Sequence, residues 1–106
     1  TLIEAVVRET LEETAWHFNP NFLVGIYQWR HPQNPNKTYL RFAFSGSVTD
    51  FDENRTLDNP IVRTIWADYD TIKMCQSKHR SPQLLRCIDD FINGSKISLS
   101  HLIEVK

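Results

Sequence analysis

The sequence lacks the features that mark several classes of protein. It has no apolar run that approaches the length of a membrane span, no signal peptide at its start and no repeat or low-complexity stretch. It also has no excess of positive charge, because 12 lysines and arginines stand against 13 aspartates and glutamates, for a net charge of −1. We therefore expect neither a nucleic acid nor a membrane as a partner, and we expect a cytoplasmic protein.

Cysteine is also scarce. Cys75 and Cys87 are the only two, they fall in different predicted helices, and they do not have the spacing of a metal-binding pair. We expect two buried thiols in a reducing compartment. The four histidines are equally scattered and suggest no ligand set.

What the chain does contain is typical of a small globular protein. Hydrophobic residues make up 41 % and charged residues 24 % of its 106 residues, which suits one domain with a modest core over residues 1–106. The chain begins at Thr1 rather than at Met, and helical periodicity starts at once. We therefore expect a further segment to precede it.

Hydrophobic periodicity predicts an α/β chain. A stripe formed by Ile3, Val7 and Leu11 predicts a helix over residues 1–15. The Asn-Pro-Asn sequence in 17–21 predicts a turn. Alternating apolar residues then predict three strands, of which the first two are expected to pair antiparallel because their connection is short. These strands cover residues 22–30, 37–48 and 61–67.

The C-terminal part is predicted to be mainly helical. A short helix is expected over 68–76, with Asp68 or Asp70 near its start. A second is expected over 81–94, where Ser81 can cap the helix, Pro82 fits the first helical position and Gly94 fits the stop. The tail after it is expected to hold a short extended segment.

The stretch RETLEET (8–14) places three carboxylates on one side of the first predicted helix. At about 100° per residue, Glu9, Glu12 and Glu13 fall within an arc of roughly 100°, away from the apolar stripe. Like charges three and four residues apart repel by roughly a few tenths of a kcal/mol per pair, and no lysine occurs in the helix. Two interpretations stay open, a solvated acidic face or a site for a hard divalent cation such as Mg²⁺.

The same stretch resembles the second half of the Nudix box, the signature of the Nudix (MutT-like) hydrolases. The matching residues are Arg8, Glu9, Glu12, Glu13 and Trp16. Thr10 stands at an apolar position of the motif, Ala15 replaces its glycine, and its first half would lie before Thr1. The resemblance implies the Nudix α/β/α sandwich with a mixed sheet, lacking its N-terminal strands in this chain.

Four further stretches resemble a bacterial subgroup of these enzymes. They are IYQW (26–29), YLRFAFSG (39–46), LDNPIVRTIW (57–66) and HRSPQLLRCI (79–88). The subgroup includes phosphatases that act on nucleoside tri- and diphosphates and on thiamine-pathway pyrophosphates. The resemblance therefore implies a small-molecule nucleotide or pyrophosphate substrate, a Mg²⁺ cofactor for which Mn²⁺ can substitute, and a monomer or homodimer.

The resemblance also implies roles for the residues of the box. Glu9 and Glu13 would be the principal Mg²⁺ ligands and Glu12 an auxiliary one, while Arg8 would orient the helix through Glu4 or Glu12. The base that accepts the proton of the attacking water would be a glutamate of the box or a carboxylate on a later loop. Asp58 is the best later candidate, although its place in LDNP also suits an ordinary turn residue.

Four residues outside the helix are candidates for substrate contact, and each has a plain structural alternative. Arg41, beside Tyr39 in the second strand, can hold a phosphate, or it is an exposed strand arginine. Arg80 can meet a phosphate at the start of the last helix, or it only precedes that helix. Tyr27, like Trp29, can stack on a heterocycle, or it belongs to the core.

Two other functions remain open at this point. The first is a Nudix pyrophosphohydrolase for another substrate class, such as a dinucleotide or a nucleotide sugar. The second is a non-catalytic Nudix-like binding domain. The presence of all three glutamates argues against a degenerate site, whereas the segment expected before Thr1 leaves an inert chain possible.

Overall fold

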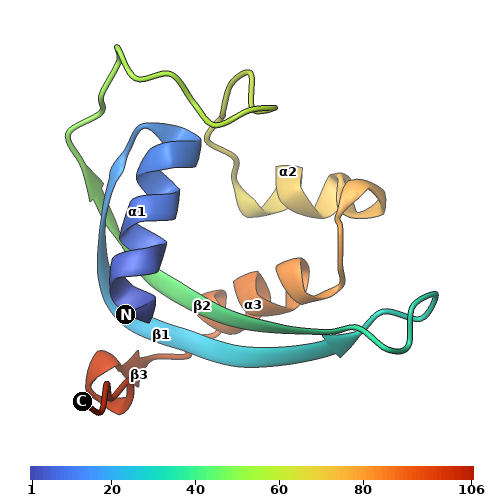
Figure 1. Ribbon diagram of the computed structural model, residues 1–106. Coiled ribbons are helices and arrows are strands. Elements are labelled where there is room, and N and C mark those ends of the chain that lie inside the picture. The colour runs from blue at the N-terminus through green and yellow to red at the C-terminus, as the bar shows by residue number, and fades with distance from the viewer.

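The computed structural model describes all 106 residues and contains both helices and strands, as expected for an α/β chain (Figure 1). The helices are α1 (Leu2–Thr14), α2 (Tyr69–Met74) and α3 (Gln83–Ile92). The strands are β1 (His17–Arg30), β2 (Thr38–Thr49) and β3 (Ile97–Ser98). Two 3₁₀ turns, η1 (Gln76–Lys78) and η2 (Leu99–His101), complete the set. No helix is long and apolar enough to cross a membrane.

The three strands form one sheet in the order β2-β1-β3, and both α1 and α3 pack against β1. The predicted antiparallel pairing of the first two strands is confirmed, with Arg30 opposite Thr38 and His17 opposite Thr49. The expectation of a mixed sheet is not met by these three strands, which are all antiparallel. The reason is their connectivity: β1 and β2 form a hairpin, and β3 returns along the other edge of β1.

The predicted turn over residues 17–21 is wrong, because these residues form the first part of β1. Pro20 lies opposite Gly46, and the register shifts directly after it, between Pro20 and Phe22. A bulge tolerates a proline that has no N–H to donate. Gly46 permits the close approach of the two backbones, since a Cβ there would collide with the carbonyl oxygen of Asn19.

The predicted third strand over 61–67 is also wrong. The segment pairs with no strand, and its apolar side chains are largely open to solvent, with Val62 92 % and Trp66 73 % exposed. The alternating pattern was sufficient for a strand, but a strand also requires a neighbour to complete its hydrogen bonds. Here the free edge of β1 is occupied by β3 instead.

Helix α1 begins and ends through its own terminal residues. The Thr1 hydroxyl accepts a hydrogen bond from the Glu4 N–H at 3.0 Å and so caps the first turn. At the other end Ala15 adopts a left-handed conformation, with φ 65° and ψ 11°, and its N–H donates to the carbonyl of Leu11 at 2.9 Å. This is the position that glycine prefers after a helix, and alanine takes it here at a cost in backbone strain.

The last helix agrees with its predicted end more closely than with its predicted start. Gly94 follows it with φ +89°, as expected of a helix stop. At the start, Pro82 rather than Ser81 is the capping residue, while the Ser81 hydroxyl accepts from the Gln83 N–H at 3.3 Å. Asp68 caps α2 through a 2.9 Å bond from the Thr71 N–H, and Ile97–Ser98 form the extended segment expected in the tail.

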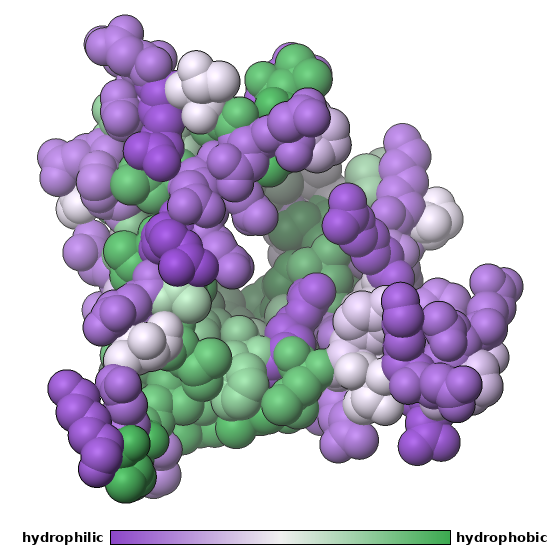
Figure 2. Space-filling view, in the orientation of Figure 1, coloured by the Kyte–Doolittle hydropathy of each residue, from purple (hydrophilic) through white to green (hydrophobic).

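Little of the chain is fully buried. Ala15, Leu23 and Val24 are the only buried apolar residues, where α1 and β1 meet. The radius of gyration is 15.0 Å, compared with about 13 Å for a compact domain of this length. Apolar side chains gather in the hollow near the middle of the face drawn in Figure 2. Both cysteines are free, and neither is buried as expected, because Cys75 is exposed and Cys87 is half-buried.

The conformation of Ala15 predicts which substitutions this position can accept. Because Ala15 is 2 % exposed and left-handed, a β-branched residue there would meet both strain and crowding. We expect Ala15→Val to lower the free energy of unfolding by roughly 2–4 kcal/mol. Ala15→Gly should change it by less than about 1 kcal/mol, since relief of the strain offsets the lost methyl group and the added chain entropy.

Urea unfolding of the two variants measures this difference, with Ala5→Val as a control inside the same helix. Ala5 has helical dihedrals, so we expect a cost below about 1 kcal/mol there. Equal losses for Ala15→Val and Ala5→Val would show that the left-handed turn does not constrain residue 15.

Candidate functional site

The polar face of α1 carries Arg8 and three glutamates, which are Glu9, Glu12 and Glu13. Arg8 forms ion pairs with two of these three glutamates. The Arg8 guanidinium lies 3.9 Å from a carboxylate oxygen of Glu9 and 3.7 Å from one of Glu12. The expected pairing of Arg8 with Glu12 is therefore found, whereas Glu4 pairs with the chain's amino group at 3.6 Å. These pairs are largely exposed and contribute little to stability. Their main effect is to place a positive charge between the two carboxylates.

Glu13 is the carboxylate of this cluster that has no ion-pair partner. It is exposed and lies one helical turn after Glu9. No group of three or more carboxylate, imidazole or thiol side chains converges as a ready-made metal cage. The donor set nevertheless fits Mg²⁺, which is usually held by one or two carboxylates while waters and substrate phosphates complete its shell. The unpaired Glu13 and its neighbour Glu9 would supply two such carboxylates.

The loop after β2 is fastened to the C-terminal half of α1 by two backbone hydrogen bonds. The Asp52 N–H donates to the carbonyl of Ala15 at 2.8 Å, and the Asp58 N–H donates to the carbonyl of Glu12 at 3.0 Å. The Asp58 carbonyl in turn accepts from the Ile61 N–H at 2.7 Å. Asp58 is thus the turn residue that its sequence suggests, and the turn also places it beside the acidic helix.

A cavity of about 810 Å³ lies between this loop and α1. Trp16 lies at the centre of its aromatic lining, with the Phe51 ring centroid 4.9 Å and the Trp66 ring centroid 5.8 Å away. Sequence reasoning missed these residues, because Phe51 lies in a stretch read only as polar and Trp66 in a stretch read as a strand. No local sequence signal could have found them, because the three residues are far apart in the sequence.

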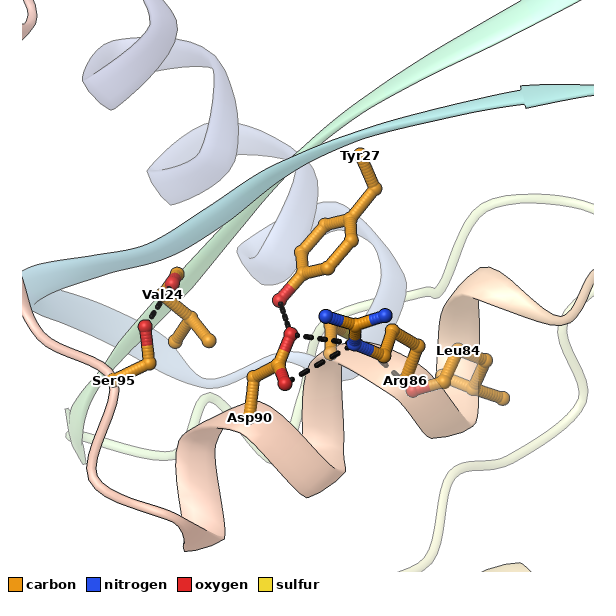
Figure 3. A network of polar contacts seen from close by, with 7 residues as sticks. Val24, Tyr27, Leu84, Arg86, Asp90 and Ser95 are labelled. Atoms are coloured by element: carbon orange, nitrogen blue, oxygen red, sulfur yellow. Dashed lines mark hydrogen bonds and ion pairs between the residues drawn. The ribbon is translucent and has the colours of Figure 1, made fainter.

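The candidate substrate residue Tyr27 lies in a different network, between β1 and α3 (Figure 3). Its hydroxyl donates to a carboxylate oxygen of Asp90 at 2.7 Å, and the Arg86 Nε atom donates to both oxygens of the same carboxylate, at 3.1 and 3.0 Å. Burial, reinforced by this hydrogen bond, raises the pKa of Tyr27 to about 12. The hydrogen bond from Tyr27 and the charge of Arg86 hold the pKa of Asp90 below its usual value.

Two of the other candidate substrate residues lie on the same face of the hairpin as Tyr27. Arg41 lies directly across the hairpin from Tyr27, and cross-strand partners share a face. Tyr39 lies opposite Trp29, and its carbonyl accepts from the Gln83 side chain at 3.2 Å. Arg80 is exposed and lies three residues before the start of α3.

The sequence-predicted residues therefore form two groups in the structure. Arg8 and the three glutamates lie on α1, whereas the four substrate candidates lie on the hairpin and before α3. Of these four, Tyr27 lines a second cavity of about 580 Å³. No hydrogen bond or ion pair connects the two groups. The structure brings Asp58, and not the four substrate candidates, to the acidic helix.

The acidic helix α1 and the helix α3 pack on the same β-sheet, and a comparison with solved structures shows the class of protein to which this arrangement belongs. The chain superimposes on a solved structure described as a NUDIX hydrolase from Nitrosomonas europaea with a TM-score of 0.92 and 42 % sequence identity. The match covers 100 % of this chain and 70 % of that chain. No model of a known protein family matches the chain, and no curated protein does. The identity and coverage show that the chain belongs to the Nudix hydrolase family and has its α/β fold.

The Tyr27–Asp90 contact predicts a specific loss of stability at high pH. The pKa of Tyr27 is raised in the folded state to about 12, from about 10 in an unfolded chain. The hydroxyl therefore contributes stability that is fully present below about pH 10 and is lost as the pH rises through about 12. We expect the stability difference between the wild type and Tyr27→Phe to be constant near neutral pH and to shrink above about pH 10.

Urea unfolding at a series of pH values tests this prediction. Tyr39→Phe is the matched control, because the Tyr39 hydroxyl makes no hydrogen bond to a carboxylate. A difference for Tyr27→Phe that stays the same up to about pH 12 would show that the hydroxyl is not held by Asp90.

Proposed function

We propose that this chain carries the catalytic helix of a Mg²⁺-dependent hydrolase of phosphoric anhydrides, which releases phosphate from nucleoside di- and triphosphates or from thiamine-type pyrophosphates. The observation that carries the proposal is the arrangement on α1, where Arg8 engages Glu9 and Glu12 and leaves Glu13 without a cation. The family membership supports hydrolysis, and the subgroup resemblance supports the substrate class.

In this proposal Glu9 and Glu13 hold the ion and Glu12 assists them. When bound, Mg²⁺, or Mn²⁺ in its place, supplies positive charge that polarises a phosphoryl oxygen and favours ionisation of a bound water. Arg8 keeps the carboxylates of Glu9 and Glu12 oriented. The proton of the attacking water passes to a carboxylate at hydrogen-bond distance, and Glu12 and Asp58 are candidates because their backbones are hydrogen-bonded to one another.

Substrate binding by Tyr27, Tyr39, Arg41 and Arg80 stays a prediction. Their position around α3 requires a substrate that reaches from the acidic helix across the sheet. The guanidinium groups of Arg41 and Arg80 make no ion pair within the chain, so both remain available for a phosphate. A cytoplasmic monomer or homodimer is part of the same proposal.

Replacing Glu13 should separate a metal site from a solvated acidic face. We expect Glu13→Gln to abolish Mg²⁺-dependent hydrolysis, because it removes a charged ligand. The same change should leave the metal-free protein as stable as the wild type, or more stable by a few tenths of a kcal/mol, because it relieves repulsion with Glu9. Phosphate release and metal-free thermal unfolding are measured on the same variant.

Glu4→Gln is the matched control, since Glu4 is exposed on the same helix and pairs only with the chain's amino group. It should keep turnover close to that of the wild type. Wild-type turnover by Glu13→Gln would mean that the metal assignment for α1 is wrong.

A panel of anhydrides tests the substrate class. We expect orthophosphate from nucleoside di- and triphosphates, with thiamine pyrophosphate also accepted, and the products are identified by chromatography. Activity confined to dinucleotides or nucleotide sugars would contradict the subgroup assignment and favour the alternative Nudix substrate class. Metal binding without hydrolysis of any anhydride would favour a binding domain.

A further inference from the structure

Gly25 lies inside β1 at a place where the backbone itself does not require a glycine. Its φ is not positive, unlike that of Gly94, so other residues can adopt the same conformation. The register of the hairpin shifts directly before it, between Leu23 and Gly25, but only a bulge with a left-handed residue favours glycine. A glycine inside a strand also marks the close approach of another group. The reason for Gly25 therefore lies in what approaches it.

The group that approaches Gly25 is the side chain of Tyr27. Residues two apart in a strand share a face, and the Tyr27 ring leans back along β1 over Gly25. A Cβ atom on Gly25 would lie 2.7 Å from Tyr27 Oη, 2.9 Å from Cζ and 3.0 Å from Cε2. These separations are well below the roughly 3.5–4.0 Å at which carbon atoms pack. The ring therefore occupies the space that any side chain at residue 25 would fill.

The Tyr27 ring is held in this position by the end of α3 (Figure 3). Its hydroxyl donates to the Asp90 carboxylate at 2.7 Å. The Asp90 carbonyl accepts from the Ser95 N–H at 2.9 Å, and the Ser95 hydroxyl donates to the carbonyl of Val24 at 2.6 Å. The two attachments of α3 therefore meet β1 on either side of Gly25.

A side chain at residue 25 can be accommodated only if the Tyr27 ring moves, because the ring atoms are the nearest obstacle. That movement separates the hydroxyl from Asp90. The Asp90 carboxylate would keep Arg86, whose Nε atom donates to both of its oxygens at 3.1 and 3.0 Å, so no buried charge is left without a partner. The expected result is a weaker attachment of α3 in a chain that still folds.

We infer that Gly25 is the positioning residue of this attachment. The space that it leaves free lets the Tyr27 ring lie along β1 and its hydroxyl hold α3, and a larger residue at position 25 releases that hold. The inference goes beyond the proposed function, because it concerns how α3 is fixed to the sheet and requires neither a metal nor hydrolysis.

Thermal unfolding of Gly25→Ala in two backgrounds tests the inference. In the wild type we expect Tm to fall by roughly 5 °C or more, because the hydrogen bond to a charged group is lost. In Tyr27→Val no ring covers residue 25, so the same change should leave Tm unchanged or raise it, since alanine lowers the entropy of the unfolded chain. Gly94→Ala is the control. Its loss comes from a φ of +89° with no atom within 4 Å, and it should be equal in both backgrounds.

The contact itself is measured by nuclear Overhauser effects at neutral pH. In the wild type we expect the ring protons of Tyr27 to show effects to the side chain of Asp90, and Gly25→Ala should abolish them. Tyr69 provides an internal control, because its hydroxyl donates at 2.7 Å to the neighbouring Asp89. The effects between Tyr69 and Asp89 should remain in Gly25→Ala.

Equal losses of Tm from Gly25→Ala in both backgrounds would overturn the inference, and so would a Tyr27–Asp90 contact that persists in Gly25→Ala. If Gly25→Ala does not fold in the wild type, the double variant with Tyr27→Val decides. A folded double variant supports the role of Gly25, whereas a double variant that fails to fold while Tyr27→Val folds contradicts it. Tyr27→Phe, which lacks only the hydroxyl, serves as the second background if Tyr27→Val does not fold, and Gly25→Ala should then lower Tm by less than in the wild type.

Discussion

The left-handed turn at Ala15 joins the parts of the molecule that matter for function. Its N–H ends α1 by donating to Leu11, and its carbonyl accepts from Asp52 at the start of the loop that follows β2. The residue is buried where α1 and β1 meet. Ala15, in a strained conformation, therefore determines how α1 meets the sheet and binds the loop that follows β2. The strain is tolerated because the surrounding hydrogen bonds and packing determine the conformation together.

The Tyr27–Asp90–Arg86 network has a different role, because it attaches α3 to the hairpin. The Tyr27 hydroxyl donates a hydrogen bond to the Asp90 carboxylate. Just beyond the helix, the Ser95 hydroxyl donates to the carbonyl of Val24 at 2.6 Å. These contacts fix α3 at two points along β1. Tyr27 therefore has a structural function whether or not it also touches a substrate, and its ring rather than its hydroxyl is what remains available.

Local sequence signals predicted the elements that depend on local interactions. The apolar stripe gave α1 to within a residue at each end, and Gly94 marked the end of α3 because its positive φ is a property of the residue itself. The predictions failed where the outcome depends on distant partners. Pro20 sits inside a strand because Gly46 faces it, and residues 61–67 form no strand because no neighbour pairs with them.

The residues of the candidate site were likewise predicted where local spacing places them and missed where distant contacts do. The three glutamates were found from spacing along one helix, since that geometry follows from 3.6 residues per turn. The aromatic cavity was not found, because Trp16, Phe51 and Trp66 are brought together only by the backbone bonds between the loop and α1. Asp58 was identified as a candidate from the motif, but only the structure places it beside Glu12.

The size of the electrostatic repulsion explains why such an acidic helix is stable enough to form. Arg8 already compensates two of the three carboxylates, so the remaining repulsion on α1 is mainly that of Glu13 with Glu9. That repulsion amounts to roughly a few tenths of a kcal/mol in an exposed helix, whereas an ion that stabilises the charge of a transition state contributes several kcal/mol. Under the proposed function, a small loss of stability in the metal-free protein would therefore be compatible with a much larger gain in catalysis. A purely solvated face would offer no such gain, and a lysine at position 13 would then be the more stable choice because it could pair with Glu9.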